Sequence, residues 1–132
     1  MRKIMLTVLS LGIILILGGC AKPTLKGLYQ TEKDVNGYFV QISILQKDNS
    51  FVEYIDNREV DRGSYEKLDD NVYKMKSDKQ NFKITLNNDN SFEIIINKLN
   101  DGNQIKMKNI SATPTVFPAI FDDADEYKTL LE

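Results

Sequence analysis

Four carboxylates within one short stretch are the first candidates for chemistry in this sequence. Glu53, Asp56, Glu59 and Asp61 flank the dipeptide Asn57-Arg58. Two neighbouring carboxylates in different environments can act as a general acid and a general base. The same pattern is also typical of the solvated rim of a hairpin turn. We favour the turn, and predict no catalytic residue here.

The composition excludes the commonest catalytic and metal chemistry. The chain contains no His and a single Cys, which rules out Ser-His-Asp and Cys-His catalysis and the usual zinc sites. Residues 34–37 (Asp-Val-Asn-Gly) and 87–90 (Asn-Asn-Asp-Asn) offer oxygen ligands, but they lack the alternating spacing and final Glu of a calcium loop. We predict that both are turns, and that the protein is not an enzyme and holds no metal or cofactor.

Aromatic side chains recur along the chain and have two possible roles. They could fill a core, or they could line a cavity that opens at one end and binds an apolar ligand. The candidate cavity residues are Tyr29, Tyr38, Phe51, Tyr65, Tyr73, Phe82 and Phe92. A filled core is favoured, because a domain of this length leaves little room inside.

A second apolar group lies near the end of the chain. Phe117, Ile120 and Phe121 belong to a segment interrupted by Pro114 and Pro118. Such residues are either buried or form an exposed patch that contacts a partner.

The lone cysteine closes a segment with the order of a secretory signal. Arg2 and Lys3 precede an apolar run from Ile4 to Leu17, and Gly18-Gly19-Cys20 follows. This segment resembles the lipobox of bacterial lipoproteins. The resemblance implies cleavage between Gly19 and Cys20 and a diacylglycerol thioether on Cys20. The protein would then be lipid-anchored at the cell membrane, facing the exterior or, where an outer membrane is present, the periplasm.

These signals divide the chain into four parts. We expect a cleaved signal peptide over 1–19, a lipidated tether over 20–26, a β-barrel over 27–110, and a Pro-containing segment with a C-terminal helix over 111–132. Removing the 19 signal residues from 132 leaves 113, with 15 basic and 19 acidic residues and a formal charge of −4. This balance argues against nucleic-acid binding, which normally requires a basic stripe.

The elements that must position these residues are strands. Period-two alternation, as in Phe82-Lys83-Ile84-Thr85-Leu86, recurs between turns rich in Asn, Asp and Gly. The predicted strands are about 25–30, 37–46, 50–56, 59–67, 71–77, 80–87, 91–98 and 103–110. We predict an all-β fold, an antiparallel eight-stranded meander that closes into an up-and-down barrel, with an open sheet or a sandwich as the alternative. Asp122-Asp123 is expected to cap a short helix over 124–131 that packs on the outside of the barrel.

The predicted meander is similar in architecture to the calycin superfamily, which includes the lipocalins. Gly27-Leu28-Tyr29 resembles the lipocalin Gly-x-Trp with Tyr in place of Trp. Gly63-Ser64-Tyr65 has the same Gly-x-Tyr pattern. The chain lacks Trp, the Thr-Asp-Tyr turn and a late Arg to stack on the first strand.

Two functions therefore remain open. One is a non-catalytic surface module that binds an envelope protein, of the immunity, exclusion or inhibitor type. The other is a lipocalin-like carrier of a small hydrophobic ligand, which requires a cavity and an entrance.

Overall fold

The computed structural model describes residues 22–132. Cys20 and the cleavage site at Gly19 lie outside the described residues. Among residues 22–132, no helix is both long enough and apolar enough to cross a bilayer.

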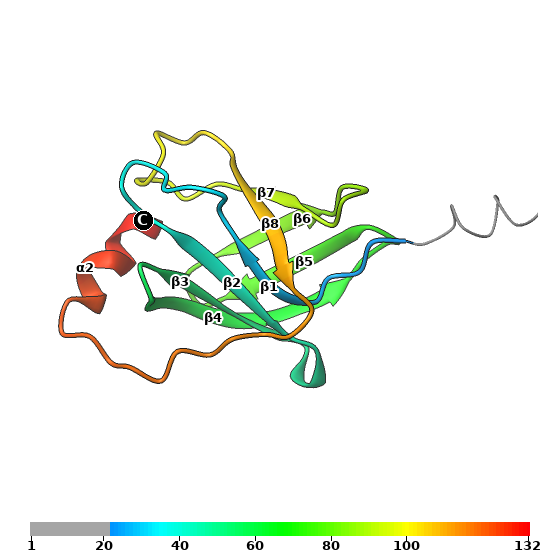
Figure 1. The fold of residues 1–132 in the computed structure, drawn as a ribbon, viewed down its shortest axis with the longest axis horizontal. Helices are drawn as coiled ribbons and strands as arrows, with labels where there is room; N and C mark the ends of the chain where they lie inside the picture. Colours follow the sequence, from blue (N-terminus) through cyan, green and yellow to red (C-terminus); the bar gives the residue numbers. More distant parts are fainter. Residues whose placement is uncertain (1–21) are drawn as a thin grey trace, which may run out of the picture.

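Eight antiparallel strands form one sheet that curls into a nearly closed barrel (Figure 1). The strands are β1 (Gly27–Gln30), β2 (Val40–Leu45), β3 (Ser50–Ile55), β4 (Arg58–Lys67), β5 (Val72–Ser77), β6 (Asn81–Thr85), β7 (Phe92–Ile94) and β8 (Ile105–Ser111). Each of the eight predicted strands is present, so the all-β fold class is confirmed.

Closure of the sheet has one interruption. The strand order is β6-β5-β4-β3-β2-β1-β8-β7, so β1 pairs with β8 as an up-and-down barrel requires. β6 and β7 are the two edges and do not pair with each other. We call the gap between these edges the seam.

The core lies inside the barrel and follows from alternation along each strand. Inward residues such as Ile42, Ile44, Phe51, Met75 and Met107 are fully buried. Burying one such side chain stabilises the fold by about 1.5–3 kcal/mol, and this burial fixes the register of the strands.

β7 is much shorter than the predicted strand over 91–98. The chain leaves the sheet after Ile94, although Ile96 remains buried. The end of the chain takes the place of a strand partner here, because the Lys98 N–H donates to the Leu130 carbonyl at 2.9 Å and the Asn97 amide donates to the Leu131 carbonyl at 3.3 Å.

The C-terminal region runs back along the outer wall of the barrel. Residues 112–123, here called the strap, cross the outside of β2, β3 and β4 (Figure 1). They lead to α2 (Ala124–Lys128) and a 3₁₀ turn, η2 (Thr129–Leu131), which lie at one end of the barrel. Leu131 is buried in the core cluster, so this short helix closes that end of the barrel.

The predicted side-chain capping of this helix by Asp122-Asp123 is wrong, although the position of the cap is correct. Asp123 occupies the N-cap position, but its side chain forms no capping hydrogen bond. Its two oxygens instead accept from the Arg58 guanidinium, from Nε at 3.0 Å and from Nη2 at 3.0 Å. This bidentate pair joins the start of the helix to β4.

The domain begins earlier than the predicted boundary between tether and barrel. Leu25 falls in the overlap between the expected tether over 20–26 and the first predicted strand, about 25–30; it is 1% exposed and belongs to the core cluster. Its carbonyl accepts from the Gln46 amide at 3.2 Å in η1 (Gln46–Asp48). Leu25 therefore closes the end of the barrel opposite α2.

Gly27 is required where β1 begins. Its φ of +76° lies in the left-handed region, and a Cβ there would lie 2.0 Å from the Ser111 carbonyl oxygen of β8. Only a residue without Cβ permits this approach of the two strands that close the barrel.

Candidate functional site

The four clustered carboxylates lie on opposite sides of the barrel wall. Glu53 is 0% exposed and Asp61 is 7% exposed, so the predicted solvated rim is wrong for these two. Asp56 and Glu59 remain on the outside, where Glu59 pairs with Arg62.

A β-bulge explains the separation. Glu53 is paired with Asp61, whereas Tyr54 is paired with Glu59, so Val60 is an extra residue on β4. Without the bulge, Glu59 and Asp61 would share a face. With it, Asp61 faces inward beside Glu53.

The two buried carboxyls belong to a polar cluster inside the barrel. Asp61 Oδ2 accepts from Ser77 Oγ at 2.6 Å and from Gln80 Nε2 at 2.7 Å, and its Oδ1 accepts from the Arg62 backbone N–H at 2.9 Å. The Gln80 amide also lies 3.5 Å from Glu53 Oε2. Gln80 therefore bridges the two acids.

Glu53 is the less satisfied member of this cluster. Its Oε1 is buried and has no hydrogen-bond partner. Burial, and then the charge of Asp61, raise the pKa of Glu53 to about 8. A buried carboxyl of this kind is held in its neutral form at neutral pH.

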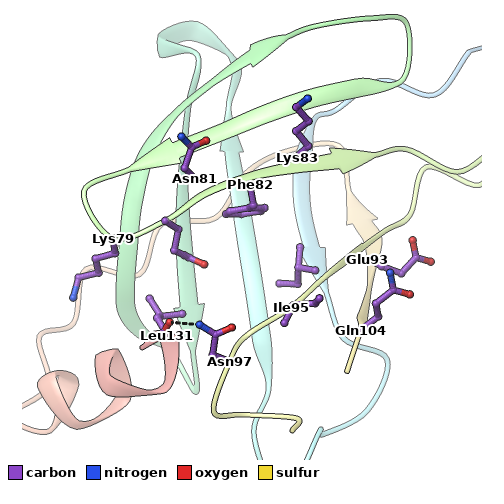
Figure 2. A pocket seen from close by; sticks show the side chains of 11 residues that line it. Lys79, Asn81, Phe82, Lys83, Glu93, Ile95, Asn97, Gln104 and Leu131 are labelled. Atoms are coloured by element: carbon purple, nitrogen blue, oxygen red, sulfur yellow. Dashed lines mark hydrogen bonds between the residues drawn. The ribbon is translucent and has the colours of Figure 1, made fainter. Parts of the chain in front are cut away.

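The cluster adjoins a groove of about 430 Å³ that lies over the seam between β6 and β7. Figure 2 shows side chains from β6, from β7 and its following loop, and from Leu131 gathered around it. Lys79, Lys83 and Glu93 supply charge, while Phe82 supplies apolar surface. Gln80 lines the groove as well as holding the carboxyls, so it separates the groove from the buried acids.

The sequence did not single out Ser77 or Gln80. Both lie where β5 ends and the turn to β6 begins, and the Ser77 hydroxyl accepts from the backbone N–H groups of Lys79 and Gln80 at 3.1 Å and 3.0 Å. A Ser before a turn is a common local signal. Nothing local indicates that Gln80 would contact residues of β3 and β4.

The seven candidate cavity residues all belong to one packed cluster. Four are buried in it and three pack against it: Tyr29, Phe51, Tyr73 and Phe92, and then Tyr38, Tyr65 and Phe82. Tyr29 and Phe92 have ring centroids 4.7 Å apart, and burial raises the pKa of Tyr29 to about 12. Phe51 with Phe82 and Tyr65 with Tyr73 form two further ring pairs within this set, whereas Tyr38 packs against Tyr127.

The three residues of the candidate partner patch differ in exposure: two pack against the barrel and one is exposed. Phe117 packs edge-on against Tyr54 at 4.8 Å, and Phe121 lies under the Arg58 guanidinium at 4.2 Å, so both attach the strap to the barrel. Ile120 is 96% exposed and contributes its whole side chain to the surface. Val116, on the same strap, is 53% exposed.

The chain matches no protein-family model, no curated protein and no solved structure in the comparisons with known proteins.

The two candidate calcium segments form turns, as predicted. Asn36 and Gly37 have φ of +52° and +89° in a tight turn closed by the pairing of Val35 with Tyr38. Within residues 22–132, no group of three or more Cys, Asp or Glu side chains is arranged to hold a metal ion.

Proposed function

We propose that this protein is a lipid-anchored, non-catalytic module of the cell surface that binds a protein partner through the strap. The observation that carries the proposal is Ile120, a β-branched apolar side chain that is 96% exposed on a segment attached to the barrel on both sides.

The strap holds its apolar side chains in a defined position. The Thr115 N–H donates to Ser43 Oγ at 2.9 Å, and the Phe117 N–H donates to the Tyr54 hydroxyl at 3.2 Å. The Arg58–Asp123 pair fixes the other side of Ile120. A surface fixed before binding loses little conformational entropy on association, which favours affinity.

The depression beside the strap suits a partner's side chains. It has a volume of about 420 Å³ and is bounded by Phe117, Ile120 and Phe121 with Arg62 and Lys128 at its rim. Covering an apolar side chain such as Ile120 contributes about 1.5–3 kcal/mol, the size of an anchor residue in an interface.

The placement of the strap is consistent with an anchored protein. Residue 22 lies at the end of the barrel opposite α2, where Lys22 contacts Asp70 at 3.4 Å (Figure 1). A lipid on Cys20 would therefore hold that end at the membrane. Ile120, next to α2 in the chain, would face away from it.

The buried acids do not alter the non-catalytic proposal. A general acid must come within hydrogen-bond reach of a substrate. In the conformation of this structure Glu53 has no exposed atom, and Gln80 lies against both carboxyls. The alternative, a carrier of a small hydrophobic ligand, requires an interior cavity. The packing of all seven aromatic residues in one cluster supports the surface module instead.

The proposal is tested by site-specific photo-crosslinking in cells that express the full-length chain. A photoreactive amino acid replaces Ile120 or, as a matched control, Ile110, which is 53% exposed on β8. We expect one discrete adduct from position 120 that excess unlabelled protein competes away, and none from position 110. Equal adducts at both positions, or none at position 120, would reject the strap as the binding surface.

The anchor is tested separately. Mass spectrometry of the protein extracted from the membrane fraction should give a chain that begins at Cys20 and carries the added mass of a diacylglycerol thioether. A chain with an unmodified Cys20 would contradict a lipid on this residue.

A further inference from the structure

The pair Glu53 and Asp61 lacks the cationic partner that buried carboxylates normally have. Among the described residues, no Lys or Arg side chain forms a hydrogen bond or ion pair with either group. Two facing carboxylates in a low-dielectric interior are strongly unfavourable unless a proton or a cation compensates their charge.

The unpaired oxygen indicates that an interaction is missing. Glu53 Oε1 has no partner although the residue is fully buried. A single proton on Glu53 compensates one charge and supplies one donor. Three carboxylate oxygens lie at this position: Glu53 Oε1, Glu53 Oε2 and Asp61 Oδ2. Asp61 Oδ2 accepts from Ser77 Oγ at 2.6 Å and from Gln80 Nε2 at 2.7 Å. Glu53 Oε2 lies 3.5 Å from Gln80 Nε2, and Glu53 Oε1 has no partner.

The groove over the seam provides a route to this pair. Gln80 lines the groove and lies against both carboxyls, so rotation of one side chain connects the groove with them. The volume of about 430 Å³ is within the range of small-molecule sites. Phe82, Ile94 and Leu131 contribute apolar surface to a lining that also carries Lys79 and Lys83.

We propose that the groove over the seam binds a small organic cation, a primary alkylamine in its ammonium form, whose ammonium group replaces the Gln80 amide between Glu53 and Asp61. A primary ammonium carries three N–H donors, which matches the three acceptor oxygens. A short alkyl chain would contact the apolar surface of the groove. A metal ion fits less well, because two carboxylates are fewer than hard cations usually recruit.

This site is independent of the strap. The strap crosses the outside of β2–β4, whereas the groove lies between β6 and β7. Failure of one proposal therefore leaves the other unaffected.

The test is isothermal titration calorimetry of the full-length chain in detergent micelles with n-butylammonium chloride. Tetramethylammonium, which has no N–H donor, and sodium butyrate are the matched ligand controls. We expect saturable one-to-one binding of n-butylammonium alone. Because the ammonium competes with the proton on Glu53, its affinity should rise roughly tenfold per pH unit up to about pH 8 and level off above it.

Two variants complete the test. Glu53→Gln should weaken n-butylammonium binding by at least about tenfold, while Glu66→Gln, an exposed position on β4 outside the groove, should keep it within about twofold. Circular dichroism confirms that each variant is folded. If Glu53→Gln does not fold, the pH dependence of n-butylammonium affinity in the wild type still tests the proposal.

Three results would overturn the proposal: no saturable heat with n-butylammonium at pH 8.5, equal binding of tetramethylammonium, or affinity that does not change with pH. Binding of calcium without any response to the amine would also reject the ammonium site.

Discussion

Burial of Glu53 inside the barrel couples the stability of the domain to pH. The pKa of this carboxyl is raised from 4.5 to about 8, chiefly by burial and further by Asp61. The folded chain therefore holds this proton more tightly than the unfolded chain does. The contribution of Glu53 to stability is fully present below about pH 4.5 and is lost as the pH rises to about 8.

Glu53→Gln should remove this pH dependence. The wild type should lose stability relative to the variant by up to about 1.4 kcal/mol per pH unit across this interval, and by nothing above it. Urea unfolding at several pH values measures the difference. Glu66→Gln, an exposed position on β4, serves as the control. A stability difference that stays constant from pH 5 to pH 8 would contradict a buried, protonated Glu53.

Gly27 and Gly37 allow two effects of a glycine substitution to be separated: a steric clash with a neighbouring strand and the strain of a positive φ. Both have positive φ, but a Cβ on Gly37 meets nothing within 4 Å, whereas one on Gly27 lies 2.0 Å from the Ser111 oxygen. Gly37→Ala should cost about 1 kcal/mol from backbone strain alone. Gly27→Ala should cost clearly more, because β1 and β8 must separate. Equal losses in chemical denaturation would show that the contact with Ser111 is unimportant.

At the scale of elements, α2 depends on tertiary contacts. The helix has five residues and contains no buried side chain, which is too short for stability in isolation. The Arg58 guanidinium binds Asp123 and lies 4.2 Å from the Phe121 ring and 4.8 Å from the Tyr127 ring. One side chain of β4 therefore joins the strap and the helix.

Arg58→Lys should loosen this junction without unfolding the barrel. Lysine keeps the charge but loses the bidentate geometry and the stacking on the two rings, so the junction is weakened. Amide hydrogen exchange should accelerate in α2 and η2 while β2 and β3 are unchanged. Arg62→Lys is the control, because Arg62 pairs only with Glu59 at the surface. Unchanged exchange in α2 would mean that Leu131 and Tyr127 hold the helix without Arg58.

At the scale of the whole molecule, the seam is the least secured part of the barrel. β3 has hydrogen-bonded neighbours on both sides, whereas β6 and β7 each have one. Amides in unpaired edges open at lower free energy than those in the centre of a sheet.

Amide hydrogen exchange in the wild type should therefore be slower in the central strands than in the two edge strands. Amides of β2, β3 and β4 should exchange slowest, and those of β7 and the free edge of β6 should be the fastest of the strands. Exchange in β6 and β7 as slow as in β3 would indicate that the seam is closed in solution.

The eight strands could be predicted from the sequence because strand formation in this chain depends on local patterns. Side chains alternate between faces with a period of two, and Asn, Asp and Gly occupy the left-handed turn positions, as Asn36, Asn49 and Asn57 do. A short C-terminal helix was likewise evident from residues 122–131. The length of the domain, and not the spacing of the seven aromatic residues, favoured a filled core over a ligand cavity; in the structure these residues belong to the core cluster or pack against it.

The tertiary structure alone decided which polar groups are buried together inside the barrel. The bulge at Val60 turns Asp61 inward and leaves Glu59 outside, and a bulge has no reliable signal in the local sequence. Gln80 reaches Glu53 across 27 positions of sequence, and the end of the chain replaces the expected second half of β7. The sequence by itself determined where strands and turns form, because side-chain alternation and turn propensity depend on residues close together in the chain. Burial of the acids, the open seam and the exposure of Ile120 depend on contacts between distant segments, which exist only once the barrel has folded.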